Sequence, residues 1–391
     1  MKKITLLLFL IGNFVLAQNT AVPDPNFEQV LIDLGYDTVL DGQVLTSNIN
    51  NVVELDVYEK NINDITGIEG FTALQSLTAG SNNYTNINLT QNTELKVLNL
   101  LPSQPLDELD VSANINLEEL YIACPSLNYV DVTNNPKLKT FYSREFYSNL
   151  TFIDITQNPL LQELRVRNNQ LTELDVSNNP FLMYLECDGN NITNLNITNN
   201  LELGVLFCGF NPLTEIDTSQ NSMLWWADFT QIQLTDIDLS QNQDMSMLRC
   251  NDNANLTSLN IQNGTNFGLA LEAIRNPNLK CIFVDDKNNI PSNWTVDPNV
   301  NYVESQAECD ALGIDELNTT LFNLYPNPAN KSFYIDSKIS IEKVSIYDVF
   351  GKLIKTFPLQ NEYDVSELSN GMYIINIETD KGTNTKKFIK Q

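Results

Sequence analysis

A repeat of about 21 residues constrains this chain more than any other feature of its sequence. Tripeptides of the form Leu-Asp-Val begin 21 to 23 residues apart, and five of the seven intervals are 21. A second ladder of the form L-x-x-L-x-C, with valine or phenylalanine at some of the cysteine positions, runs between them. Each unit is therefore predicted to hold two short strands with alternating apolar residues, joined by turns. The tripeptides begin at Leu109, Val130, Ile153, Leu174, Leu195, Ile216, Ile237 and Leu259.

One unit of this kind has an apolar edge that it cannot bury alone. The units are therefore expected to stack into a solenoid of about ten coils, in which like residues form columns. The predicted fold is mainly β.

Two sets of asparagines support the stacking. A side-chain amide at a tight turn can donate to and accept from the backbone, so we expect these residues to satisfy groups that the turns leave unpaired. The first set follows the tripeptides, and the second lies on the opposite side of each coil. The first set is Asn92, Asn114, Asn135, Asn158, Asn179, Asn200, Asn221 and Asn242, and the second is Asn169, Asn190, Asn211 and Asn253.

The repeat resembles the leucine-rich repeat family, whose signature is L-x-x-L-x-L-x-x-[N/C]-x-L. Residues Leu182 to Ile192 (LMYLECDGNNI) and Leu203 to Leu213 match this signature, and the resemblance covers roughly residues 51–284. The repeat length and the doubled strand are similar to the bacterial internalin-like subclass. Ser143 and Ile232 depart from the pattern, so their coils are expected to be locally irregular.

The composition excludes several kinds of chemistry. The chain has no histidine, which removes Ser-His-Asp and Cys-His nucleophile pairs and histidine-ligated metals. The acidic residues recur once per coil and are explained by the repeat, so we predict no catalytic residues, no metal, no cofactor and no enzyme activity. The net charge of −27 also disfavours nucleic acid as a partner.

The cysteines fall into two groups. Cys187, Cys208 and Cys250 share one column and are predicted to be buried free thiols, with a Cys187–Cys208 disulfide as the alternative. Cys281 and Cys309 bracket the segment after the last coil, and they are predicted to form a disulfide that closes a C-terminal cap.

The two ladders present different outward faces. The Leu-Asp-Val face repeats an acidic residue, which indicates either a solvated face whose hydroxyls cap turns or a weak site for cations or basic peptides. The other face varies from coil to coil and carries aromatic and arginine side chains, the usual anchors of recognition surfaces. By resemblance it is the concave face of a leucine-rich repeat. Its candidate binding residues are Tyr121, Tyr142, Arg165, Tyr184, Phe207, Trp226 and Arg249.

The two ends of the chain indicate export. Lys2 and Lys3 precede an apolar run that ends with Val15-Leu16-Ala17, as in a signal peptide cut after Ala17. This run is shorter than the ~20 residues that a membrane span needs, and no second long apolar run appears, so no integral segment is expected after cleavage. Asp24-Pro25 begins a short helix that ends at Gly35, within an N-terminal cap.

The last 71 residues form a separate domain. They hold nine basic and eight acidic residues, against 13 and 41 in residues 1–320, and they are predicted to fold as a small β-sandwich. The motifs Leu324 to Pro328 (LYPNP), Leu368 to Tyr373 (LSNGMY) and Lys386 to Lys390 (KKFIK) resemble the type A sorting domain of the type IX secretion system of Bacteroidota. This resemblance implies that the secretion machinery handles the domain and carries the rest of the chain across the outer membrane.

These observations define the predicted organisation. The chain is expected to be a secreted or surface-attached protein that recognises a protein or glycan, with a structural spacer as the alternative. The predicted segments are a signal peptide at 1–17, an N-terminal cap at 18–50, leucine-rich repeats at 51–284, a cap and linker at 285–320 and a sorting domain at 321–391.

Overall fold

The computed structural model describes residues 18–101, 105–143, 149–264, 266–315, 322–337, 340–379 and 382–391. The contacts divide the chain into two compact units, Met1–Glu304 and Ser305–Gln391, and each is described by itself. The predicted signal peptide lies outside the described residues, as do residues 316–320 of the predicted linker. Within the predicted cap and linker, residues 306–315 form the helix α3 (Gln306–Asp315).

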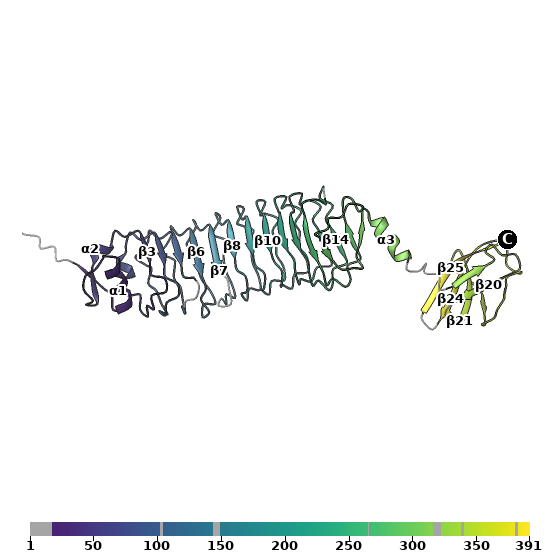
Figure 1. The fold of residues 1–391 in the computed structure, drawn as a ribbon, viewed down its shortest axis with the longest axis horizontal. Helices are drawn as coiled ribbons and strands as arrows, with labels where there is room; N and C mark the ends of the chain where they lie inside the picture. Colours follow the sequence, from purple (N-terminus) through teal and green to yellow (C-terminus); the bar gives the residue numbers. More distant parts are fainter. Residues whose placement is uncertain are drawn as a thin grey trace, which may run out of the picture. The chain divides into compact units, whose positions relative to one another are not determined.

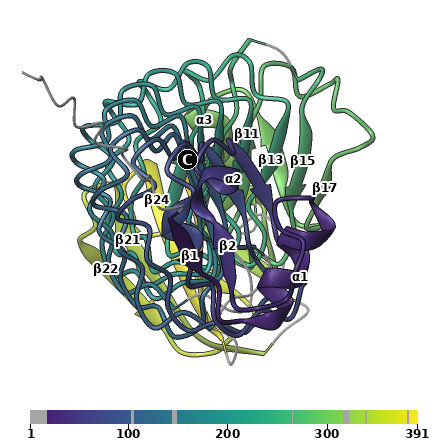
Figure 2. The same ribbon diagram turned by 90° about the vertical axis from the view of Figure 1, so that its left-hand side faces the viewer.

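The first unit is a solenoid built on one parallel sheet of twelve strands, which lie side by side along the stack (Figure 1). Successive strands come from successive coils, except that strands of a second sheet fall between the last ones in the sequence. Figure 2 looks along the stack and shows the coils behind one another. The strands are β3 (Glu54–Asp56), β4 (Ser76–Thr78), β5 (Val97–Asn99), β6 (Glu119–Ile122), β7 (Thr140–Ser143), β8 (Glu163–Arg165), β9 (Tyr184–Glu186), β10 (Val205–Phe207), β11 (Trp226–Asp228), β13 (Met247–Arg249), β15 (Ala270–Ala273) and β17 (Thr295–Val296).

The pleat of each strand explains the repeat pattern. The second residue of a strand points into the core, as Leu164, Leu185 and Leu206 do, and each of these is fully buried. Its neighbours on either side point outward, since side chains alternate along a strand. Mainly β structure with a leucine-rich solenoid is therefore confirmed.

The second ladder differs from the prediction of two strands in every coil. The Leu-Asp-Val segments form a regular parallel sheet only near the end of the solenoid, and an isolated bridge pairs Asp110 with Asp131. The first strand of this sheet lies before Met245, and the other three lie after it. The four strands are β12 (Asp236–Asp238), β14 (Ser258–Asn260), β16 (Cys281–Phe283) and β18 (Asn301–Val303).

The two asparagine sets are both buried, but they bond differently. In the first set the amide of Asn179 donates to the carbonyls of Ile155 (3.1 Å) and Asn158 (2.9 Å), and its oxygen has no partner. The prediction that these residues also accept was wrong for Asn92 to Asn221, and in this set only Asn242 accepts a bond. In the second set Asn190 both accepts from the Leu171 N–H (3.0 Å) and donates to Val166 (2.8 Å). The second set therefore both donates to and accepts from the backbone of the preceding coil.

The coils that depart from the repeat pattern keep the strand register. Ser143 is fully buried and still pairs with Ile122, and β11, in the coil of Ile232, pairs with both neighbouring strands. The strands at these two positions are therefore regular, and whether their whole coils are irregular stays a prediction, since residues 144–148 lie outside the described residues. Adjacent strands are held by their backbone, which a changed core residue does not remove.

The N-terminal end of the solenoid is covered by a two-stranded antiparallel sheet and short helices. Asp24 caps α1 (Pro25–Asp33) by accepting from the N–H groups of Asn26 and Phe27, as the sequence predicted. Its other oxygen accepts from the Asn63 N–H at 2.8 Å, which ties the cap to the first coils. The remaining elements are β1 (Asn19–Ala21), β2 (Gln43–Leu45), α2 (Thr46–Ile49) and the 3-10 helix η1 (Ile68–Gly70).

The second unit holds two antiparallel sheets, of three and four strands, around one apolar core. Phe333 from one sheet and Phe388 from the other meet at a ring distance of 5.0 Å, so the predicted β-sandwich is confirmed. The strands are β19 (Phe322–Tyr325), β20 (Ser332–Ser337), β21 (Ile341–Asp348), β22 (Leu353–Phe357), β23 (Tyr363–Asp364), β24 (Gly371–Thr379) and β25 (Gly382–Lys390).

Candidate binding surface

The predicted binding residues lie on the outward face of the twelve-stranded sheet, in two neighbouring columns. The strand register places Tyr121, Tyr142, Arg165, Phe207 and Arg249 in one column, at the third strand position. Tyr184 and Trp226 lie in the other column, two residues earlier on their strands. Residues two apart on a strand share a face, so both columns form one surface.

Six of these residues make an unbroken row of contacts, which we call the aromatic strip. It consists of Tyr121, Tyr142, Arg165, Tyr184, Phe207 and Trp226, one from each of the strands β6 to β11. The ring centroids of Tyr121 and Tyr142 are 5.9 Å apart. The Arg165 guanidinium lies 5.9 Å from the ring centroid of Tyr142 and 4.0 Å from that of Tyr184. The ring centroid of Tyr184 lies 5.8 Å from that of Phe207, and the centroid of Phe207 lies 4.7 Å from that of Trp226. All six side chains are half-buried.

Trp225 extends the aromatic strip beyond the predicted residues. Its ring lies 5.6 Å from that of Trp226, and it is 44% exposed. Gly204 on the preceding coil makes room for it, since a Cβ there would lie 3.1 Å from the indole ring. The adjacent tryptophans in the sequence were the signal that could have identified this residue.

Arg249 is placed on the same face but is separate from the aromatic strip. Its Nε lies 3.3 Å from Glu272, on the next strand of the sheet. No ring lies over its guanidinium among the residues that the structure describes. Register alone therefore does not bring every predicted residue into contact.

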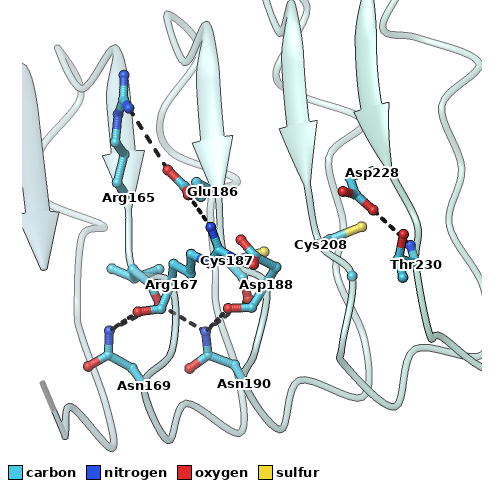
Figure 3. Close-up of polar contacts among 12 residues, drawn as sticks. Arg165, Arg167, Asn169, Glu186, Cys187, Asp188, Asn190, Cys208, Asp228 and Thr230 are labelled. Carbon is cyan, nitrogen blue, oxygen red and sulfur yellow. Dashed lines mark hydrogen bonds and ion pairs between the residues drawn. The ribbon is translucent and has the colours of Figure 1, made fainter. Parts of the chain in front are cut away.

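A buried group of charges lies beside the centre of the aromatic strip (Figure 3). Glu186 is only 2% exposed, and its carboxylate lies 3.9 Å from Arg165 and 3.7 Å from Arg167. Asp188 is buried too and pairs with the Arg167 Nε at 2.8 Å. Burial raises the pKa of Asp188 to about 6, although Arg167 opposes the rise and Glu186 adds to it. Arg165 was predicted from the sequence, but neither acid was, because acidic residues at outward positions are expected to be solvated.

The cysteine column lies in the core beneath this face. Cys187, Cys208 and Cys250 are fully buried free thiols, as predicted, and the alternative disulfide between Cys187 and Cys208 is absent. Burial raises the pKa of all three thiols. A high pKa and burial both suppress thiol reactivity, so these residues act as small apolar core groups.

Cys281 and Cys309 are both disulfide-bonded, and the other cysteines are free. Their pairing with each other stays a prediction. We expect peptide mapping without reduction to show one peptide that joins Cys281 to Cys309, and we expect iodoacetamide to label the four free cysteines only after unfolding. A cross-linked peptide that contains Cys187 or Cys208 would contradict the assignment.

The aspartates of the Leu-Asp-Val face cap turns within their own coils. Oδ1 of Asp154 accepts from the Thr156 N–H (2.9 Å) and its hydroxyl (2.7 Å), and Asp175 caps Ser177 in the same way. These bonds lower the pKa of both aspartates, with the hydroxyl the larger cause. The arrangement favours the capping interpretation of this face. No group of three or more acids or cysteines is placed to hold a metal ion in the described part of the chain.

The sorting resemblance is supported by a family model. Residues 323–391 match the secretion system C-terminal sorting domain. No curated protein sequence matches the chain. Within the ranges that the structure covers, no helix has the length and apolar character needed to cross a membrane.

Several solved structures are similar to the solenoid. The functional domain of InlJ from Listeria monocytogenes, described as including a cysteine ladder, is 20% identical with a TM-score of 0.49, over 96% of this chain and 99% of that one. The internalin InlF from the same species is 20% identical with a TM-score of 0.48, over 73% and 96%. The Leptospira interrogans leucine-rich-repeat protein LIC12759 is 19% identical with a TM-score of 0.37, over 61% and 74%.

The repeat geometry and the matched tail decide the classification. The first unit shows parallel strands, buried leucine columns and asparagine turns, and the second is the matched sandwich. The chain therefore joins a leucine-rich-repeat solenoid to a sorting domain of the type IX secretion system, which directs it to secretion or to the outer surface.

Proposed function

We propose that this protein is a binding protein that recognises an extracellular or surface partner through the aromatic strip. The observation that carries the proposal is the unbroken row of side-chain contacts across β6 to β11, on the outward face of a rigid sheet. Aromatic and arginine side chains are the commonest anchors of recognition surfaces. Rings that already contact one another lose little conformational entropy on binding.

The contrast between the two faces supports this assignment. On the Leu-Asp-Val face the same acidic residue recurs, and its side chain is used to cap a turn within the coil. On the sheet face the outward residues change from strand to strand, and the repeat does not require any of them. Variable residues on a regular scaffold are free to match a partner.

A triple variant tests the proposal. Tyr184→Ala, Phe207→Ala and Trp226→Ala together are expected to weaken partner capture at least 100-fold, because each removes an anchor of the aromatic strip. The measurement is cross-linked capture from neighbouring-cell or host surfaces by the full chain, with glycan arrays alongside. Circular dichroism checks that the solenoid remains folded.

The matched control lies on the other face. Tyr129 and Phe152 are also stacked aromatics, 6.1 Å apart and each 41% exposed, but they belong to the Leu-Asp-Val ladder. Replacing both by alanine is expected to leave capture unchanged. Equal capture by all variants, or none by the wild type, would instead favour the structural spacer.

A further inference from the structure

Two strands of the aromatic strip carry the same short pattern, an aromatic residue followed two positions later by an acid. Tyr184 and Glu186 form the pair on β9, and Trp226 and Asp228 form it on β11. In each pair the two side chains share the outward face, since they are two residues apart on a strand. An aromatic ring beside a carboxylate is a chemically suitable site for a cation.

The Tyr184–Glu186 pair on β9 binds a cation from the chain itself. Arg165 lies opposite Glu186 in the register, with its guanidinium 4.0 Å from the Tyr184 ring centroid and 3.9 Å from the Glu186 carboxylate. Glu163 contributes a further carboxylate at 3.2 Å. The protein thus shows how this surface holds a guanidinium, between a ring and carboxylates.

The pair on β11 has no such cation. The register position opposite Asp228, which corresponds to that of Arg165, is taken by Phe207, whose ring is 4.7 Å from Trp226. Asp228 accepts the Thr230 N–H at 2.9 Å. No basic side chain among the described residues pairs with Asp228, because Arg249 on the next strand turns to Glu272.

The charge of the surrounding surface favours a cationic partner. The two outward columns contain seven acids and two arginines along the sheet, and both arginines are already paired with carboxylates. The acids are Glu54, Asp56, Glu119, Glu163, Glu186, Asp228 and Glu272. Residues 1–320 add a strong negative field, with 41 acidic and 13 basic residues, which attracts basic partners.

We infer that Phe207, Trp226 and Asp228 form a site for an arginine side chain of a basic polypeptide. The guanidinium stacks on the aromatic rings and donates to the Asp228 carboxylate, in the way that Arg165 uses Tyr184 and Glu186. The inference rests on the proposed function and names the partner class for the same surface. A neutral glycan would satisfy the rings but leave the acidic charge unmatched.

The experiment uses the full chain and a capped Gly-Arg-Gly-Arg-Gly-Arg-Gly peptide. Two of the three tryptophans, Trp225 and Trp226, lie at the site, so tryptophan fluorescence reports binding. The control peptide carries citrulline in place of arginine, which keeps the shape and removes the charge. We expect the arginine peptide to bind at least tenfold more tightly than the citrulline peptide.

Matched variants locate the site. Asp228→Asn keeps the turn acceptor and is expected to weaken binding of the arginine peptide at least fivefold, and Asp228→Glu is expected to restore most of it. Asp217→Asn makes the same charge change on the other face, where Asp217 also caps a turn, and is expected to have no effect. Equal affinity for both peptides, or equal losses in Asp228→Asn and Asp217→Asn, would overturn the inference.

The outcomes also separate this inference from the proposed function. Loss of natural capture in the triple variant, together with no binding of the arginine peptide, would leave the aromatic strip as the binding surface and refute the arginine site. Binding of a neutral glycan in place of the arginine peptide would assign the surface to carbohydrate and would refute the inference in the same way.

Discussion

Replacing Asn190 by alanine is expected to lower the free energy of unfolding by about 3 to 5 kcal/mol. The substitution leaves the buried Leu171 N–H without its acceptor, and a buried unpaired donor costs about 1 to 3 kcal/mol. It also removes two short bonds from the amide, to Val166 (2.8 Å) and Cys187 (2.9 Å), each worth about 1 kcal/mol. Urea unfolding followed by circular dichroism measures the change.

Two further asparagines provide a graded control. Asn179→Ala is expected to cost less, about 2 kcal/mol, because Asn179 only donates, and the carbonyls that it reaches keep a backbone bond each. Asn178, the exposed neighbour, makes one long bond of 3.3 Å, and its alanine variant is expected to behave like the wild type. Equal losses at Asn190 and Asn179 would show that the accepting oxygen contributes nothing.

Asp188→Asn is expected to stabilise the protein at neutral pH. The pKa of Asp188 rises from 3.8 to about 6, mainly because burial disfavours the charged carboxylate. A carboxyl with a raised pKa binds protons more readily in the folded state, so the wild type should gain stability as the pH falls from above 6 to below 4. Asparagine removes the buried charge and should add up to about 3 kcal/mol at pH 7, a gain that disappears near pH 4.

Asp175→Asn is the comparison with the opposite sign. Hydrogen bonds from the Ser177 hydroxyl and N–H lower the pKa of Asp175, so its contribution is present at neutral pH and is lost as the pH falls through the folded-state pKa. The asparagine variant is therefore expected to be less stable than the wild type at pH 7 and to match it in strong acid. The urea midpoints of both variants are measured between pH 3 and 8. Midpoints that shift in the same direction for both would contradict the raised pKa assigned to Asp188.

The aromatic strip shows how far the sequence predicts a surface. The alternation of the strands placed the seven predicted binding residues at outward positions, and all seven lie on one face. Which of them touch depends on side-chain conformation across strands from different coils. Arg249 turns to Glu272, while Trp225 joins the row from a position next to the strand, and neither outcome follows from the spacing of the repeat.

The sequence by itself determined the solenoid, its buried columns and the sorting domain. A repeat that recurs at a nearly fixed interval leaves one way to bury its leucines, which is stacking in register. The tertiary structure alone decided that the second ladder is a regular sheet only in the last coils, and that Glu186 and Asp188 are buried beside Arg167. These features depend on contacts between coils, where the side chains of neighbouring coils fix burial and charge, and no single repeat contains that information.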